Sequence, residues 1–322
     1  MAKLFDIYGK NPGPGISKKE PEKTAFFKFF DTLKHKFWSL ILINAIFFVS
    51  AVFFAALSLF VMSFFSTNKI TSMFFYFLSC FPLIGLAPVM AGITRLTRDY
   101  VRGVPGFLWS DFVEAIKKNW KKSLIIGFYQ FIISFLLIVS VSFYFLQATK
   151  DSVYYIPLGI SYLISAIFIF SGYYLYMMVI SLDLKIKEII KNSLLFSFLC
   201  LGKNILVSII LLFINGSVFG LFLFSIVAGS QIISGISLAL VMAITFGFSF
   251  LVISFVSFPA IKRFILDPYY EKHPEQTSDL MKLSQSEQAE YKEKELPEFV
   301  YHNGKMVHRS SLEEENVFED NV

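Results

Sequence analysis

Residues 95–122 read RLTRDYVRGVPGFLWSDFVEAIKKNWKK and form the longest polar interruption in an otherwise apolar region of the chain. They hold seven of the 29 Lys and Arg residues. On both sides lie runs of 23 or more residues that contain no Asp, Glu, Lys or Arg. A helix needs about 20 apolar residues to cross a hydrocarbon core about 30 Å thick. The pattern therefore predicts membrane-spanning helices before and after a charged loop.

The composition is typical of a membrane protein. Of the 322 residues, 55% are hydrophobic and 40 are Phe, and the mean hydropathy is +0.62. The apolar runs are continuous, whereas a strand of a membrane barrel would alternate over about 10 residues. We therefore predict an all-α fold, a polytopic membrane helical bundle with interfacial amphipathic helices and a short cytoplasmic tail. Cys80 and Cys200 lie in or beside these runs, so we expect no disulfide framework.

The predicted organisation has three parts. Residues 1–36 form a cytoplasmic leader that ends in an interfacial helix. The helix is predicted because Phe and Lys alternate from residue 23 onward. Residues 37–257 form the membrane domain, and residues 258–322 form an acidic cytoplasmic tail. The six predicted spans are 37–65, 70–93, 123–147, 154–182, 204–227 and 232–257.

The distribution of positive charge predicts the orientation. The proposed inner segments carry 8 basic residues before the first span, 7 in residues 94–122, 4 in residues 183–203 and 8 after residue 257. The outer loops carry only Lys69 and Lys150. By the positive-inside rule, we expect a multi-pass protein of the cell membrane with both termini in the cytoplasm. The basic excess is then a topology signal, and we expect no nucleic acid among the partners.

The charged loop itself should contain two helical pieces. Arg95, Asp99 and Arg102 are spaced to pair on one helical face, and Gly103 should end that turn. Ser110 or Asp111 can cap a second interfacial helix, with Trp109 and Trp120 at headgroup depth. The basic residues of the loop are the candidate contacts with lipid or with a cytoplasmic partner. They are Arg95, Arg98, Arg102, Lys117, Lys118, Lys121 and Lys122.

Two further local patterns predict structure outside this loop. Residues 183–203 repeat the design of the charged loop, with an amphipathic helix (IIKN at 189–192, AIKKN at 115–119), which raises the idea of an internal duplication. In the tail, EFVYHNGKMVHR (298–309) predicts a hairpin turning at Asn303-Gly304.

A possible ligand cavity is predicted from polar and helix-breaking residues within the spans. Pro82, Gly85 and Pro88 should kink or break the second span near residues 81–88. Broken helices line ligand sites in some transporters but are also ordinary in membrane bundles. Asn44 and the tyrosines of the fourth span favour interhelical hydrogen bonds and packing, with ligand contact as the alternative. The candidate cavity residues are Asn44, Pro82, Gln130 and Tyr173.

The chain carries no recognisable catalytic pattern. None of the six spans contains Asp, Glu, Lys, Arg or His, the residues that usually mark ion or proton pathways. Phosphate-loop, GxSxG, HExxH and paired-cysteine motifs are absent from the sequence. His302 and His308 flank the predicted hairpin turn without other ligands nearby in sequence. We therefore expect a protein that is not an enzyme, with no catalytic residues, no cofactor and no metal site.

The chain resembles the YesL family of bacterial membrane proteins, whose domain has no assigned function. The resemblance rests on PLIGLAPVMAGITRLTRDYVRG (82–103), FLWSDFVEAIKKNWKKSLIIG (107–127) and YYLYMMVISLDLKIKEIIKNSLLF (173–196). Residues 13–44 and the end EEENVFEDNV (313–322) are similar to a subgroup from gut and soil Firmicutes. Family members are often encoded beside carbohydrate ABC uptake systems and two-component sensors. The resemblance thus implies, by association, partners among ABC transporter subunits or sensor kinases.

Two functions remain open from the sequence. The first is a non-enzymatic accessory or regulatory membrane protein associated with carbohydrate uptake or sensing, favoured by the basic inner helices and the uncharged spans. The alternative is a small-solute transporter or facilitator that uses the kinked second span and the Tyr-rich fourth span. Membrane lipids are expected partners in either case.

Overall fold

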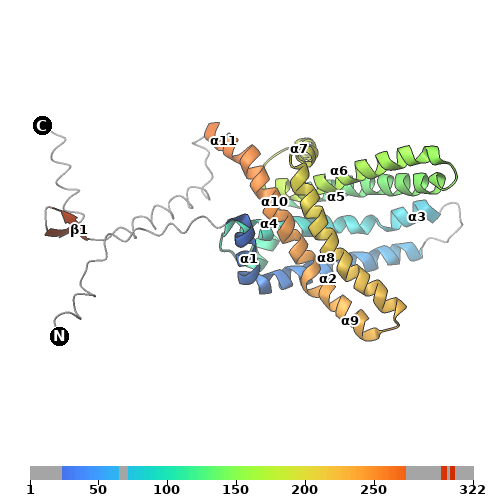
Figure 1. Cartoon of the computed structure of the whole chain (residues 1–322), viewed down its shortest axis with the longest axis horizontal. Helices are drawn as coiled ribbons and strands as arrows, with labels where there is room; N and C mark the ends of the chain where they lie inside the picture. The colour runs from blue at the N-terminus through green and yellow to red at the C-terminus, as the bar shows by residue number, and fades with distance from the viewer. Residues whose placement is uncertain (1–23, 65–71, 273–298, 303–304, 309–322) are drawn as a thin grey trace. The chain divides into compact units, whose positions relative to one another are not determined.

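The computed structural model describes residues 24–64, 72–272, 299–302 and 305–308. The chain divides into two compact units, one formed by Ala25–Leu266 and the other by Met1–Thr24 together with Asp267–Val322. The first unit is a bundle of helices (Figure 1). The apolar unit thus extends to Leu266, nine residues past the predicted end of the membrane domain at residue 257. Among the described residues, six helical segments are long and apolar enough to cross a membrane, as predicted.

The chain enters the bundle through two helices joined at Lys36. Helix α1 (Ala25–His35) is the amphipathic helix predicted before the first span, and α2 (Phe37–Ser63) is the first span. Phe29 on α1 packs edge-on against Phe255 and Phe248 of a later helix, with ring centroids 5.1 and 5.6 Å apart. One face of α1 is therefore fixed to the bundle, while Phe26, Phe27 and Phe30 on the other are exposed.

The second span is broken where the prolines predicted it. Helix α3 (Ser72–Ser79) gives way to the 3₁₀ turn η1 (Phe81–Gly85), and α4 (Leu86–Arg102) follows. Helix α4 continues for two and a half turns beyond residue 93, the predicted end of this span, as the predicted pairing of Arg95, Asp99 and Arg102 on one helical face requires. It ends where Gly103 adopts a left-handed conformation with φ 71°. The Val104 amide then donates to the Asp99 carbonyl at 3.0 Å, which satisfies a terminal carbonyl of the helix.

The third span shows a second difference from the prediction. Helix α5 runs without a break from Leu108 to Ala148, so the expected interfacial helix and the span at 123–147 are one helix of 41 residues. The expected cap at Ser110 or Asp111 is also wrong, because the helix begins after Phe107 without a side-chain cap. No Pro lies inside α5, and its polar first third consists mostly of residues compatible with a helix, so nothing forces a break.

The fourth span lies at the centre of the bundle. After η2 (Ser152–Tyr154), helix α6 (Tyr155–Ser181) buries Tyr174, Leu175, Met177 and Met178 completely. Residues 183–203 then contribute α7 (Ile186–Leu199), which ends at Cys200, and α8 (Leu201–Val227) is the fifth span. The chain is interrupted at Cys200, between α7 and α8, whereas α5 is continuous. The two basic segments are therefore built differently despite their similar motifs.

The sixth span contains a widened turn. It comprises α9 (Gln231–Leu240), the π-helical segment η3 (Val241–Thr245), α10 (Phe246–Ile261) and a second π-helical segment η4 (Lys262–Leu266). In Figure 1, α8 lies beside α9 and α10, and this group crosses the direction shared by α2, α4, α5 and α6. Large apolar side chains such as Leu212 and Phe213 on α8 face outward, as expected of a surface in contact with lipid.

The second unit contains the predicted hairpin. Strands β1 (Phe299–His302) and β2 (Lys305–His308) pair antiparallel, with Val300 opposite Val307 and His302 opposite Lys305. The register leaves two residues for the turn, which confirms the prediction of a two-residue hairpin loop; the turn itself lies outside the described residues. The short helix α11 (Asp267–Lys272) belongs to the same unit.

Candidate functional site

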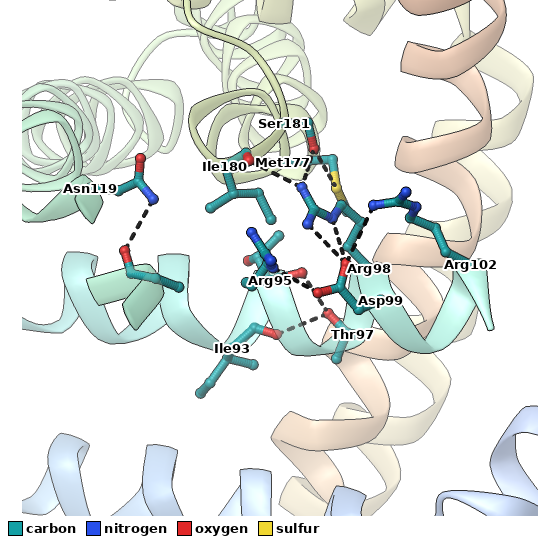
Figure 2. Close-up of polar contacts among 12 residues, drawn as sticks. Ile93, Arg95, Thr97, Arg98, Asp99, Arg102, Asn119, Met177, Ile180 and Ser181 are labelled. Atoms are coloured by element: carbon teal, nitrogen blue, oxygen red, sulfur yellow. Dashed lines mark hydrogen bonds and ion pairs between the residues drawn. The ribbon is translucent and has the colours of Figure 1, made fainter. Parts of the chain in front are cut away.

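Three arginines surround one carboxylate in the last turns of α4 (Figure 2). Arg95 Nε donates to Asp99 Oδ2 at 2.6 Å, and Arg98 donates to Oδ1 through Nε at 2.9 Å and Nη2 at 2.8 Å. Arg102 Nη1 lies 3.8 Å from the same Oδ1. The i, i+3 and i, i+4 spacing predicted the pairing of Asp99 with Arg95 and Arg102, and the structure confirms it. This arginine cluster (Arg95, Arg98, Asp99 and Arg102) carries two positive charges more than its carboxylate can neutralise.

Arg98 links the arginine cluster to the end of α6. Its Nη1 donates to the Ile180 carbonyl at 3.0 Å and to Ser181 Oγ at 3.3 Å (Figure 2). The side chain is only 6% exposed, so the guanidinium sits among fixed partners rather than in water. The last carbonyls of a helix lack intrahelical donors and carry partial negative charge, which a cation stabilises. Arg98 therefore caps α6 from a neighbouring helix.

The other face of the same turns of α4 contacts α10. Thr97 Oγ1 and Ser254 Oγ share a hydrogen bond of 2.8 Å in a fully buried position. The Arg102 guanidinium lies over the ring of Phe258, 5.9 Å from its centroid. The end of α4 thus ties α6 and α10 together through two sets of contacts. This arrangement makes the arginine cluster a rigid element of the bundle.

The start of α5 presents the remaining predicted cations. Lys122 Nζ donates to Asp183 Oδ1 at 2.7 Å and to the Leu184 carbonyl at 3.3 Å, which connects α5 to the segment between α6 and α7. The hydrogen bond and charge of Lys122 lower the pKa of the fully exposed Asp183 carboxyl. Lys121 lies 5.5 Å from the centroid of the Trp120 ring.

Lys117 and Lys118 differ from these cations. Both are exposed, and in the described residues neither has a carboxylate within 4.0 Å. They line a surface groove with Trp109, Val113 and Glu114 on the outer face of α5. The predicted contact residues therefore differ in role: the arginines lie in the arginine cluster and Lys122 pairs with Asp183. Lys117 and Lys118 are called the unpaired cations of α5, because no carboxylate of the described residues lies within 4.0 Å of them.

The four candidate cavity residues have different surroundings. Asn44 is fully buried and bonds to four backbone groups of η3 and α10, which confirms the predicted interhelical hydrogen bond. Tyr176 donates its hydroxyl hydrogen to Gln130 Oε1 at 2.6 Å, and Tyr173 shares a 2.8 Å hydrogen bond with Ser208. Pro82 lies in η1 and is half-buried. The three polar members are thus engaged with protein groups, and a ligand cavity among the four stays a prediction.

A second buried amide was not predicted. Asn204 on α8 accepts from the Tyr174 hydroxyl at 2.6 Å and donates to the carbonyls of Phe196 and Ser197, each at 3.2 Å. It fills the bend between α7 and α8, where helix-end carbonyls lack other donors. A sequence signal for it existed, because an Asn directly after a break between two apolar helices needs internal partners in a membrane.

The described residues contain no group of three or more His, Cys, Asp or Glu side chains that could hold a metal ion. The basic end of the bundle carries groups suited to electrostatic interactions. Exposed ammonium groups and an aromatic ring can receive anions, while the arginine cluster fixes the helices that carry them.

These features define a polytopic helical membrane protein. Residues 59–141 match the family model described as "Protein of unknown function, DUF624". The matched stretch runs from the end of α2 into α5 and includes the broken second span, the arginine cluster and the basic face of α5. Comparisons with curated proteins and with solved structures gave no significant match.

Proposed function

We propose that this protein is a non-enzymatic accessory or regulatory component of the cell membrane, associated with carbohydrate uptake or sensing. We further propose that it is a YesL-like protein of the Firmicutes-type subgroup. Residues 59–141 match a family model of unknown function, which supports a relationship to a membrane protein family without an assigned activity. The association with carbohydrate uptake rests on the resemblance of residues 82–103 and 107–127 to that family.

The unpaired cations on α5 carry this proposal. Lys117 and Lys118 are exposed beside Trp109, which is 65% exposed. Aromatic residues and desolvated charges supply much of the energy of protein interfaces. A rigid helix that presents two unpaired ammonium groups next to an indole suits a partner with an acidic surface, because complementary charge steers association. In the proposed orientation, Lys117 and Lys118 face the cytoplasm, where ABC transporter subunits and sensor kinase domains are accessible.

The test is crosslinking of the tagged protein in its native membranes, followed by affinity purification and mass spectrometry. We expect recovery of ABC transporter subunits or a sensor kinase. The double variant Lys117→Gln/Lys118→Gln should lose that recovery. The matched double variant Lys187→Gln/Lys191→Gln, which removes the same charge from exposed positions on α7, should keep it. Unchanged recovery with the α5 variant would overturn the proposed docking surface.

The alternative, a small-solute transporter or facilitator, is supported by a different observation. Two spans contain irregular turns, the 3₁₀ turn η1 and the π-helical segment η3. Irregular helices of this kind often mark functional sites in membrane proteins. Under this alternative, proteoliposomes should show solute flux that falls on Pro82→Ala or Tyr173→Phe. Absence of flux across a broad panel of sugars, sugar acids and small ions would argue against it.

A further inference from the structure

A groove lies where α1 meets α2. It is lined by Phe30, Leu33 and Lys34 from α1 and by Phe37 and Trp38 from α2, and its volume is about 550 Å³. The groove exists because the chain bends at Lys36, whose φ of −106° and ψ of 13° interrupt the helix. The Lys36 ammonium turns away to the Tyr100 ring, 5.3 Å from its centroid.

The lining of this groove is amphipathic. Lys34 is exposed, and in the part of the chain that the structure describes no carboxylate lies within 4.0 Å of its ammonium group. Trp38 is 77% exposed, and its indole supplies an N–H donor. Phe30 and Phe37 add exposed rings. A cation and an N–H donor therefore lie beside an apolar wall, which matches a ligand with an anionic head and an apolar body.

The groove is continuous with the outward apolar face of α2. Trp38, Leu42, Val49 and Phe53 are all exposed, and their spacing places them on one stripe of the helix. From Trp38 to Phe53 this stripe is about 22 Å long, at 1.5 Å per residue. It begins where the first membrane span begins, so Lys34 and Trp38 lie at the expected depth of the lipid headgroups.

We propose that this groove binds an anionic phospholipid, with the phosphate at Lys34 Nζ and the Trp38 indole N–H. One acyl chain then follows Phe37 and the apolar stripe of α2. A choline lipid fits less well, because its trimethylammonium group brings a second positive charge next to Lys34. The proposal does not depend on the accessory function, since it concerns α1 and α2 rather than the cationic face of α5. Bound lipid would hold α1 against α10, where Phe29 already packs on Phe255.

The test uses Trp38 as its own reporter. The variant Trp109→Phe/Trp120→Phe leaves Trp38 as the single tryptophan, because the chain contains three. This protein is reconstituted into phosphatidylcholine nanodiscs that contain a small fraction of brominated phosphatidylglycerol or of brominated phosphatidylcholine. We expect quenching that corresponds to an about fivefold preference for the anionic lipid, the value for one lysine at a membrane surface.

Matched variants on α1 decide the outcome. Lys34→Gln should abolish the preference and Lys34→Arg should retain it. Lys28→Gln, which removes the same charge from an exposed position outside the groove, should leave it unchanged. Equal quenching by the two lipids, or a preference that survives Lys34→Gln, would overturn the proposal. If soluble glycerophosphate changes the Trp38 emission in detergent while the two brominated lipids quench equally, the site binds a free phosphate and the assignment to lipid is wrong. Far-UV circular dichroism of each variant checks that the helices are intact.

Discussion

Replacing Asn44 by Leu should destabilise the bundle more than any other single polar substitution in the first span. The side-chain amide donates to the carbonyls of Val241 and Met242 at 2.8 and 2.5 Å. Its oxygen accepts from the amides of Phe246 and Gly247 at 2.6 and 2.9 Å. All four hydrogen bonds available to an Asn side chain are therefore made to one widened turn of the sixth span.

The magnitude follows from the environment of these bonds. Polar contacts between membrane helices contribute about 0.6 kcal/mol each on average and up to about 1.7 kcal/mol. Loss of four bonds should therefore lower the free energy of unfolding by roughly 2–7 kcal/mol. The upper part of the range applies if the π-helical segment keeps its shape, because the freed backbone groups then have no water to bind. Relaxation of the segment to an ordinary helix would move the loss toward the lower end.

The assay is reversible unfolding in mixed detergent micelles, followed by far-UV circular dichroism. Asn215→Leu is the matched control, because Asn215 is half-buried and bonds to its own helix at Leu211 and weakly to Ser249 at 3.3 Å. Gly247→Ala should also destabilise, since an added Cβ would lie 2.6 Å from the Leu40 carbonyl oxygen. A loss for Asn44→Leu no greater than that for Asn215→Leu would refute the reasoning.

Three further predictions concern the basic end of the bundle. Arg98→Gln should lower the unfolding free energy by about 3 kcal/mol, because it uncaps α6 in a buried site, and Arg95→Gln should cost clearly less in the same unfolding assay. Asp183→Asn should lower the melting temperature slightly at neutral pH. Because its lysine partner depresses the pKa of Asp183, the ion pair stabilises at neutral pH and is lost as pH falls below about 4, so this difference should vanish in acid. In a background without the native cysteines, Lys118→Cys should react with an impermeant maleimide only in inverted vesicles and Lys150→Cys only in intact cells; the reverse pattern would contradict the proposed orientation.

The sequence predicted the number of spans and most of their limits because the bilayer imposes one simple rule. A continuous apolar run must form a helix that satisfies its own backbone, so hydropathy alone located the spans from α2 to α10. The break at Pro82 and the hairpin at Asn303-Gly304 were equally predictable, because proline geometry and turn chemistry act within a few residues. These features depend on local physics, and the structure agrees with each of them.

The structure differs from the prediction where the local sequence does not determine whether a helix ends. Residues 94–122 were predicted to hold two helical pieces with an end at Gly103, and the structure confirms that end. The second piece was predicted to be separate from the third span, yet both belong to the single helix α5. Polarity shows that a segment leaves the hydrocarbon core, but it does not show that a helix ends there. Helix ends need a specific event, such as the left-handed glycine at residue 103, and none occurs between Lys117 and Ser123. The π-helical segment Val241–Thr245 likewise has an ordinary apolar sequence, which does not indicate the irregular turn. The one signal lies in the first span, where the amide of Asn44 needs hydrogen-bond partners on another helix.

The arginine cluster illustrates the same division within the site. The pairing of Asp99 with its neighbours on α4 follows from helical spacing, but the contact of Arg98 with Ile180 joins residues 82 positions apart. A signal for that contact is present at the other end. Helix α6 has no basic residue in its last turn, so its final carbonyls need a donor from another part of the chain. A buried arginine without hydrogen-bond partners would strongly destabilise a membrane protein. Arg98 therefore needs acceptors, and the terminal carbonyls of α6 need a donor, so the contact satisfies both groups. Arg98, predicted as a contact with lipid or a partner, instead links α4 to the end of α6. It therefore stabilises the bundle that holds α5 and its exposed lysines in place.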